Sequence, residues 1–213
     1  MILLTGFEPF GGESTNPSWV AAQRAAERLT TEGRAAVAVE IPCIFGTSRR
    51  VLEEALERYQ PEIVLCVGQA GGREQVSLER VAINVDDARI PDNAGQQPID
   101  QAIVQGGPAA YFSTLPIKAC REAVEGVGVP VEVSQTAGTY VCNHVFYGLM
   151  AALATGGTPC RGGFVHVPYS AEQGLANGRP GLALEQMVEA LVVIASTTAS
   201  TGADVRVTAG AEH

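Results

Sequence analysis

Three histidines and five cysteines limit the places where this chain can build a nucleophile and its base. A cysteine attacks a carbonyl as the thiolate, so a thiol hydrolase needs a histidine nearby to take the proton. We expect His213, the last residue, to be disordered. His144 lies two residues after Cys142, on a different side of the helix expected there. His166 is the candidate base, because it lies near the end of the apolar run 163–167, where open sheets build their sites.

Cys142 is the candidate nucleophile. It opens a helical apolar pattern after the turn 136–141, and free N–H groups at a helix start favour a thiolate and can hold an oxyanion. A buried structural cysteine is an equally open interpretation on these grounds. Cys66 falls within an apolar strand and Cys120 within a helix, where a small buried side chain is expected. Cys43 and Cys160 fall in loops without a context for catalysis.

Glu79 is the third residue of interest, because a carboxylate within the alternating segment 76–85 shares a face with apolar side chains. Burying such a group is costly unless a charged or donating partner meets it. The partner could be structural, such as Arg80 or Arg89, or it could be the ring of His166, which Glu79 would orient. Both interpretations stay open at this point.

Elements that could position these residues alternate along the chain. Apolar runs rich in β-branched residues predict strands at 1–5, 36–41, 63–67, 131–134 and 163–167. Helical apolar spacing predicts helices at 17–29, 48–59, 117–124, 142–154 and 182–196. Such alternation is typical of α/β proteins, with a mainly parallel sheet covered on both faces.

The segment 73–100 interrupts this alternation and predicts an inserted hairpin. Residues 76–85 read as one extended strand, and residues 91–98 as a polar turn region. The aspartates of this segment are interpreted as surface or turn residues: Asp86, Asp87 and Asp92.

Two glycine-rich turns, 6–12 and 68–72, follow predicted strands and fit the ligand-binding edge of an open sheet. Neither matches the glycine spacing of a dinucleotide-binding or phosphate-binding loop, so a nucleotide site lacks its phosphate cradle. The tail from about residue 202 is expected to be flexible or strand-forming, without an evident function.

Composition narrows the class of protein further. A chain of 213 residues that is 46% hydrophobic can bury one core, and a single domain over 1–213 is expected. A net charge of −9 disfavours nucleic-acid binding. The sequence shows no signal peptide and no apolar stretch that spans a membrane. An odd number of cysteines without a C-x-x-C pair indicates free thiols in a reducing cytoplasm.

Long motifs in a fixed order resemble the pyrrolidone-carboxylate peptidases, the type I pyroglutamyl peptidases, which form a family of cysteine peptidases. The resemblance covers nearly all of the chain. The motifs are residues 5–12 (TGFEPFGG), 16–19 (NPSW), 68–73 (GQAGGR), 79–84 (ERVAIN), 87–93 (DARIPDN), 136–143 (TAGTYVCN) and 165–169 (VHVPY).

The resemblance implies that Cys142 is the nucleophile, His166 the base and Glu79 the residue that orients the base. It also implies a single-domain α/β/α sandwich, no metal or other cofactor, a cytoplasmic location, and a homo-oligomer that is often a tetramer. The implied substrates are peptides that begin with pyroglutamate. The residues implied to form or border the substrate pocket are Phe7, Phe10, Asn16, Gln69, Ile90, Tyr140 and Val141.

Pyroglutamate is a lactam without a free amine, so its pocket should offer apolar walls, one donor and one acceptor. Phe7 and Phe10 are the expected walls, because their glycine-flanked turn is a poor place for core packing. The backbone of Gln69 is the expected donor and acceptor. Arg89 is assigned equally to the substrate and to Glu79. The alternatives are a phosphorylase-like or nucleoside-binding enzyme and an inactive binding protein, and the intact catalytic trio disfavours the latter.

Overall fold

A six-stranded sheet forms the centre of the computed structural model, which describes residues 1–156 and 159–210. The strand order is β2-β1-β3-β8-β4-β7, and every neighbouring pair is parallel except β4 with β8. The strands are β1 (Ile2–Phe7), β2 (Ala36–Ile41), β3 (Ile63–Gln69), β4 (Val76–Glu79), β7 (Val131–Ser134) and β8 (Arg161–Val167).

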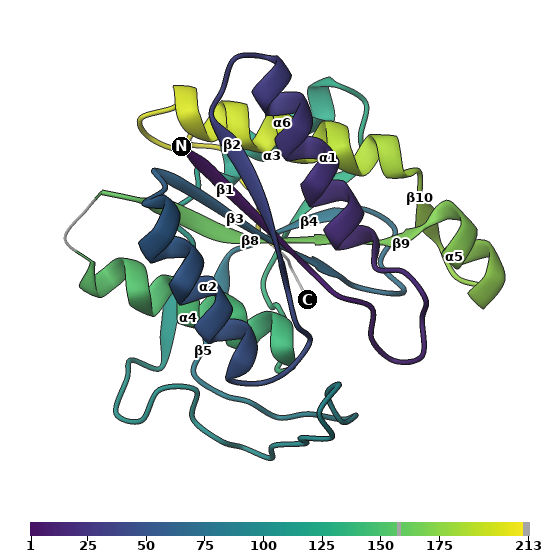
Figure 1. Ribbon diagram of the computed structural model, residues 1–213. Helices are drawn as coiled ribbons and strands as arrows, with labels where there is room; N and C mark the ends of the chain where they lie inside the picture. The colour runs from purple at the N-terminus through teal and green to yellow at the C-terminus, as the bar shows by residue number, and fades with distance from the viewer. Residues whose placement is uncertain (157–158, 211–213) are drawn as a thin grey trace.

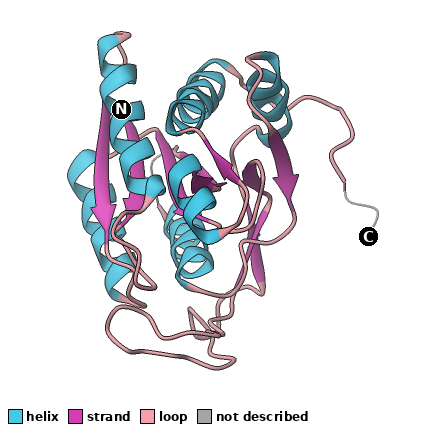
Figure 2. Cartoon of the chain, turned by 90° about the vertical axis from the view of Figure 1, so that its right-hand side faces the viewer, coloured by secondary structure: helices cyan, strands magenta, loops and turns pink. Residues whose placement is uncertain are grey.

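Helices cover both faces of this sheet, with α1, α3 and α6 on one side and α2 and α4 on the other (Figures 1 and 2). The predicted α/β/α sandwich with a mainly parallel sheet is therefore confirmed. The helices are α1 (Pro17–Thr31), α2 (Thr47–Tyr59), α3 (Ile117–Gly126), α4 (Val141–Thr155), α5 (Ala171–Asn177) and α6 (Leu184–Ser200).

Alternation along β3 explains why its sequence is almost entirely apolar. Ile63, Leu65 and Val67 pack into the core beneath α1, α3 and α6, whereas Val64 and Cys66 pack into the core beneath α2 and α4. Successive side chains of a strand point to opposite faces, so a strand buried on both faces must be apolar at every position. Each half of the molecule therefore has its own apolar core, and the sheet separates the two.

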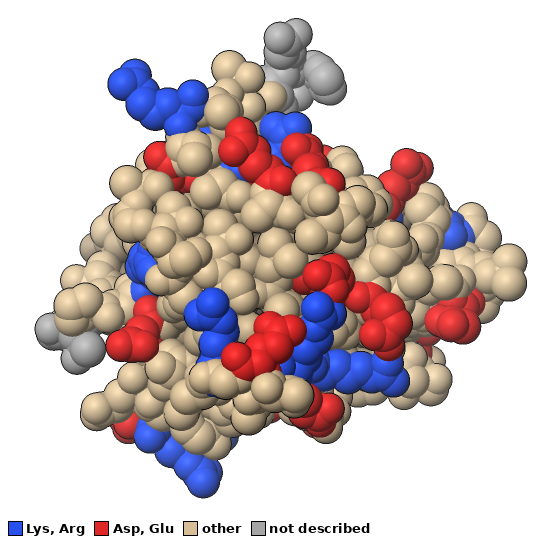
Figure 3. Space-filling model, turned by 90° about the horizontal axis from the view of Figure 1, so that it is seen from above, with Lys and Arg blue, Asp and Glu red and all other residues tan. Residues whose placement is uncertain are grey.

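The outer surface of α1 and α6 carries charges of both signs (Figure 3). Arg24 pairs with Glu185 at 2.6 Å, and Arg28 pairs with Glu189 across the same two helices. Such exposed pairs contribute little stability individually.

The segment 76–85 differs from the predicted single strand, because the chain leaves the main sheet at Arg80. Residues 76–79 form β4 within that sheet, whereas β5 (Val81–Ile83) pairs antiparallel with β6 (Ala110–Phe112) in a separate ribbon. The long connection 84–109 joins the two strands of this ribbon, and it lies below α2 and α4 in Figure 1. The inserted hairpin is thus real, but its boundaries are later than predicted.

Other short elements were not predicted: β9 (Tyr169–Ser170), β10 (Gly181–Leu182) and α5. The tail after residue 202 makes contacts through Asp204, whose carboxylate accepts the N–H groups of Lys118 and Ala119 at the start of α3. Arg80 donates to the carbonyl of Ala209. His213 lies outside the described residues. Within them, no helix is long and apolar enough to cross a membrane.

Candidate active site

His166 and Glu79 meet near the carboxyl end of β8, although the strand that carries Glu79 runs antiparallel to β8. In the antiparallel register between β4 and β8, Ser77 lies opposite His166, and Glu79 follows two residues later on β4. The Nδ1 atom of His166 lies 2.7 Å from the Oε1 atom of Glu79, and the two residues are 4% and 0% exposed. An ionised carboxylate can only accept, so Nδ1 carries the proton and Nε2 has the free lone pair that a base needs.

The electrostatics of this pair favour a neutral imidazole beside an ionised carboxylate. Burial lowers the pKa of His166 below its ordinary value of 6.5, although the hydrogen bond and charge of Glu79 oppose that effect. Burial raises the pKa of Glu79, but the hydrogen bond and charge of His166 and the charge of Arg73 together bring it below 4.5. His166 is thus held ready to accept a proton at neutral pH.

Cys142 is the second residue of α4, and its thiol lies above the backbone of β3 at Gly68. A Cβ atom at Gly68 would lie 2.8 Å from the Sγ atom of Cys142, so only glycine leaves room for the thiol. Gly68 is also the residue paired with His166 in the β3–β8 register, which brings thiol and imidazole to the same place. No hydrogen bond joins them among the described residues, and such bonds often form only when substrate binds.

The environment of the thiol opposes the thiolate that a helix start favours. Burial raises the pKa of Cys142 well above 9.0, and the charges of Cys43 and Glu79 raise it further. Desolvation therefore outweighs the helix dipole, and the nucleophile depends on a base.

The start of α4 offers a binding site for an oxyanion. Its N-cap residue Tyr140 makes no side-chain cap, and the first helical hydrogen bond runs from the N–H of His144 to the carbonyl of Tyr140. The N–H groups of Val141, Cys142 and Asn143 therefore have no partner within the helix. An oxygen that becomes negative beside the thiol can accept from them.

The ion-pair partner of Glu79 is Arg73, a residue that the sequence did not single out. Its Nη1 atom lies 2.7 Å from Oε1 of Glu79, and its Nη2 atom donates to the carbonyl of Thr136 at 3.0 Å. The two arginines suggested from the sequence as structural partners do not pair with Glu79. Arg80 binds Gln135 and the tail, because it lies beyond the end of β4. Arg89 is exposed, and no ion pair joins it to Glu79 in the described chain.

The two phenylalanines of the first glycine-rich turn have different environments. Phe7 is 2% exposed within β1 and packs against Phe164, so core packing describes it better than a pocket wall. It lies within the strand rather than in the turn, because β1 extends two residues further than expected. Phe10 lies beyond the strand, is half-buried, and packs against Tyr140 with ring centroids 6.2 Å apart.

The backbone of Gln69 lies beyond the end of the pairing between β1 and β3. The N–H of Ala70 bonds to Val167 on β8, so the neighbouring N–H of Gln69 points the other way, towards β1. Pairing between β1 and β3 ends at Thr5 with Cys66, and the N–H of Phe7 bonds to a side chain instead. The backbone of Gln69 therefore borders a gap between two diverging strands.

Asn16 has a structural role in the conformation observed. It is 3% exposed, caps α1 by accepting from Ser18, and donates to the carbonyl of Glu8. It thereby fixes the turn that carries Phe10.

Three further predicted pocket residues lie where α4 meets the connection 84–109. The hydroxyl of Tyr140 donates to the carbonyl of Pro91 at 3.0 Å, which attaches this connection to the start of α4. Ile90, the preceding residue, is 36% exposed and accessible to a ligand. Val141 is fully buried and packs in the core beneath α4.

A second histidine and carboxylate pair joins α4 to the connection 84–109. The Nδ1 atom of His144 lies 2.8 Å from Oδ2 of Asp86, and its Nε2 atom accepts from the N–H of Gly46. The aspartates of the insertion are thus not all surface residues: Asp86 is 6% exposed, and Asp92, equally buried, accepts from the N–H of Phe45. His144 has both ring nitrogens engaged, so it cannot serve as the base.

We expect His144→Ala to lower stability more than turnover. The change leaves Asp86 and the N–H of Gly46 without their partner, at a cost of about 2–4 kcal/mol in the free energy of unfolding. Because the base is retained, turnover per folded molecule should fall by less than about tenfold. Denaturant melts and active-site titration of the same sample measure the two effects. A stable variant without turnover would contradict this assignment.

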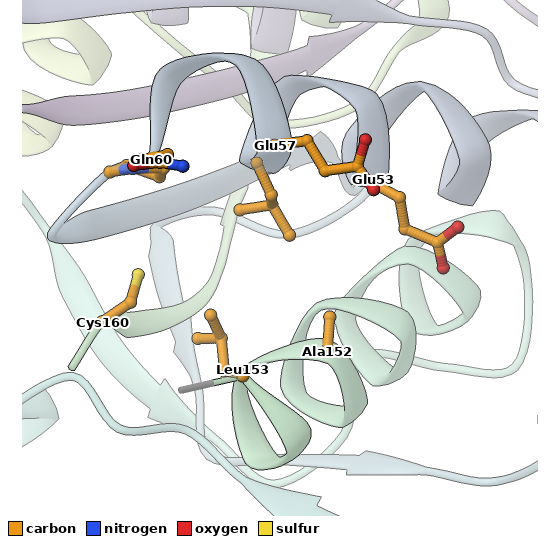
Figure 4. Close-up of a pocket in the computed structure, with 9 residues that line it drawn as sticks. Glu53, Glu57, Gln60, Ala152, Leu153 and Cys160 are labelled. Carbon is orange, nitrogen blue, oxygen red and sulfur yellow. The ribbon is translucent and has the colours of Figure 1, made fainter. Parts of the chain in front are cut away.

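A cavity of about 290 Å³ lies between α2 and α4, lined by residues that include Glu53, Leu153 and Cys160 (Figure 4). None of the predicted site residues lines it. Cys160 precedes β8, whereas His166 is near the carboxyl end of that strand, so the cavity is roughly 20 Å from the imidazole. The cavity lies at the amino-terminal end of β8, opposite the end that carries the site, and plays no part in that site.

Comparison with known proteins gives a consistent result. The model of the pyroglutamyl peptidase family matches residues 1–201. The chain is 55% identical to a pyrrolidone-carboxylate peptidase of Cupriavidus taiwanensis and 53% identical to one of Streptomyces coelicolor, over all of this chain and 99% of each relative. Among solved structures, pyroglutamyl peptidase I of Bacillus amyloliquefaciens has a TM-score of 0.92 at 49% identity, covering 97% of this chain and 98% of that one.

Proposed function

This chain belongs to the pyroglutamyl peptidase family and is a cysteine peptidase that removes N-terminal pyroglutamate, and we propose that Cys142, His166 and Glu79 carry out the reaction. The observation that supports this assignment most strongly is the buried contact of His166 with Glu79, 2.7 Å long, beside a thiol packed on Gly68. The alternatives of a phosphorylase-like enzyme and of a binding protein are set aside, because the relatives are peptidases.

In the proposed first step, Nε2 of His166 takes the proton of Cys142 and the thiolate attacks the carbonyl of the pyroglutamyl residue. The negative oxygen that forms accepts hydrogen bonds from the start of α4. Glu79 stabilises the imidazolium, which then protonates the departing amine. Water, activated by the same imidazole, hydrolyses the thioacyl-enzyme and releases pyroglutamate.

We propose that the lactam ring binds between the diverging ends of β1 and β3. The backbone N–H and C=O of Gln69 can meet the lactam C=O and N–H there, and Phe10 with Tyr140 provides an aromatic wall. Ile90 borders the opening and contacts the peptide, as does Arg89. Asn16 acts through the turn that holds Phe10 rather than through the ligand.

Release of a fluorophore from a pyroglutamyl amide tests this function directly. The purified protein should release it, and prior treatment with iodoacetamide should abolish release together with the appearance of a single alkylated peptide that contains Cys142. Hydrolysis that survives full alkylation of Cys142 would refute the thiol mechanism.

Prolyl amides should be poor substrates of the same protein. Proline lacks the lactam C=O, so one donor of the pocket stays unpaired, and its amine is charged. We expect kcat/KM to be at least about 100-fold lower for the prolyl than for the pyroglutamyl amide. Steady-state rates with one leaving group measure the ratio, and similar values would rule out lactam recognition.

We also propose the partners, the location and the oligomeric state of the enzyme. The net charge of −9 and the mixed charges on the face in Figure 3 support a protein that does not bind nucleic acid. Free thiols in all five cysteines support a cytoplasmic location. We further propose a homo-oligomer, which light scattering of the purified protein can test.

A further inference from the structure

The side chain of Arg73 joins two parts of the site that are far apart in sequence. One arm of the guanidinium reaches Glu79 at 2.7 Å, and the other reaches the carbonyl of Thr136 at 3.0 Å. Arg73 ends a tight turn after β3, closed by its own N–H on the carbonyl of Ala70. A planar fork with fixed donors can hold two acceptors at once, which a lysine ammonium on a flexible stem does less well.

The first arm acts on the charge of Glu79. Both His166 and Arg73 bind its Oε1 atom, whereas Oε2 is buried and accepts no hydrogen bond in the described part of the chain. When His166 is neutral, Arg73 provides the only full positive charge in contact with this carboxylate among the described residues. Ser134 lies opposite Glu79 in the sheet and adds only a neutral hydroxyl.

The second arm acts on the backbone that leads to the nucleophile. Thr136 starts the turn that runs through Gly138 and Tyr140 into α4, where Cys142 is the second residue. Holding the Thr136 carbonyl therefore fixes where this turn begins relative to Glu79. Small displacements of reacting groups are costly, since a misplacement of about 1 Å can reduce rates by about 100-fold.

We propose that Arg73 is a positioning residue of the peptidase, which keeps Glu79 charged and aligned on His166 and at the same time fixes the turn that carries Cys142. The proposal rests on the proposed function of these three residues. It assigns Arg73 no contact with substrate.

The expected pH dependence follows from the titratable groups that face the imidazole and thiol: Glu79, Arg73, Cys142, Cys43 and Cys66. The positive charge of Arg73 lowers the pKa of His166 and the pKa of Cys142. Removing that charge therefore raises both, and the acid limb of the activity profile moves to higher pH. A lysine in its place keeps the charge and should leave the limb unchanged.

The test compares Arg73→Met and Arg73→Lys with Arg80→Met. Arg80 is a matched control, because it adjoins Glu79 in sequence but binds Gln135 and Ala209 instead. For each variant we would measure kcat and KM for a pyroglutamyl amide against pH. The rate of Cys142 alkylation by iodoacetamide would be followed on the isolated peptide, with Cys142→Ala as the blank. The second readout does not require peptidase turnover.

We expect Arg73→Met to lose about 10- to 100-fold in kcat with little change in KM, and its acid limb to move to higher pH in both profiles. Arg73→Lys should lose part of kcat and keep the limb, and Arg80→Met should resemble the wild type. Wild-type kcat and pH profiles in both Arg73 variants, or equal losses in Arg80→Met, would overturn the proposal. If Arg73→Met does not fold, wild-type kcat in Arg73→Lys overturns it. Failure of the wild type to cleave pyroglutamyl amides would instead reject the proposed function, and the alkylation profiles would still test Arg73.

Discussion

Replacing Cys142 with alanine is expected to reduce kcat for pyroglutamyl amide hydrolysis by a factor on the order of 10⁴ or more. The reaction forms a bond between the sulfur and the pyroglutamyl carbon, and no other thiol lies above Gly68 in the described structure. What remains is the stabilisation of an oxyanion attacked by water, which is a small part of the acceleration. Cys142→Ser should be almost as inactive, because His166 is arranged for a thiol and not for the much less acidic hydroxyl.

The fold should survive this change, which makes the result interpretable. Cys142 is partly buried near the start of α4, and alanine keeps its backbone and Cβ while removing only the sulfur that packs on Gly68. Thermal melts should therefore place Cys142→Ala close to the wild type. Matched controls are Cys66→Ala, Cys120→Ala and Cys160→Ala, which remove thiols outside the proposed trio and should retain activity. A fully active Cys142→Ala enzyme would exclude the thioacyl mechanism.

The sequence was sufficient for the layers of the fold because its apolar periods are strong. The strands at 36–41 and 131–134 have the predicted boundaries, and each predicted helix overlaps an observed one. The alternation of apolar residues did not predict where the chain passes from the main sheet into the separate ribbon. Between Glu79 and Val81 the alternation continues without interruption, although the backbone leaves the main sheet, because apolar residues recur at every second position on both sides of the break.

The candidate trio could be found from residue types, but its partners could not. Arg73 and Glu79 are six residues apart, and nothing in that spacing indicates that a turn brings them together. The pairing of His144 with Asp86 spans 58 residues and depends on the path of the connection 84–109. Such contacts are set by topology, which charge pattern along the chain does not encode.

The protonation state of the site is the clearest case in which tertiary structure decides. A cysteine at a helix start favours a thiolate through the dipole, and this is all that a sequence reports. Burial opposes this effect and raises the pKa of Cys142. Burial also lowers the pKa of His166, so both shifts favour a resting state with a neutral thiol beside a neutral imidazole over an ion pair.

That resting state leads to the second prediction, which concerns His166→Ala. Without an imidazole, a neutral thiol has no group to take its proton, and the departing amine has no acid to protonate it. We expect kcat/KM at neutral pH to fall by a factor on the order of 10³ to 10⁴. His144→Ala is the matched control, because it removes a buried histidine from the same region without removing the base.

The pH profile of this variant distinguishes loss of the base from loss of structure. In the wild type, kcat/KM should fall only when His166 becomes protonated, and burial places that limb below pH 6.5. In His166→Ala this acid limb should disappear. The residual rate should rise with pH, because the thiol of Cys142 can then lose its proton only to solvent. A variant that merely unfolded would lose activity equally at every pH and would melt at a lower temperature. An acid limb that persists unchanged in a folded His166→Ala enzyme would transfer the role of the base to another residue.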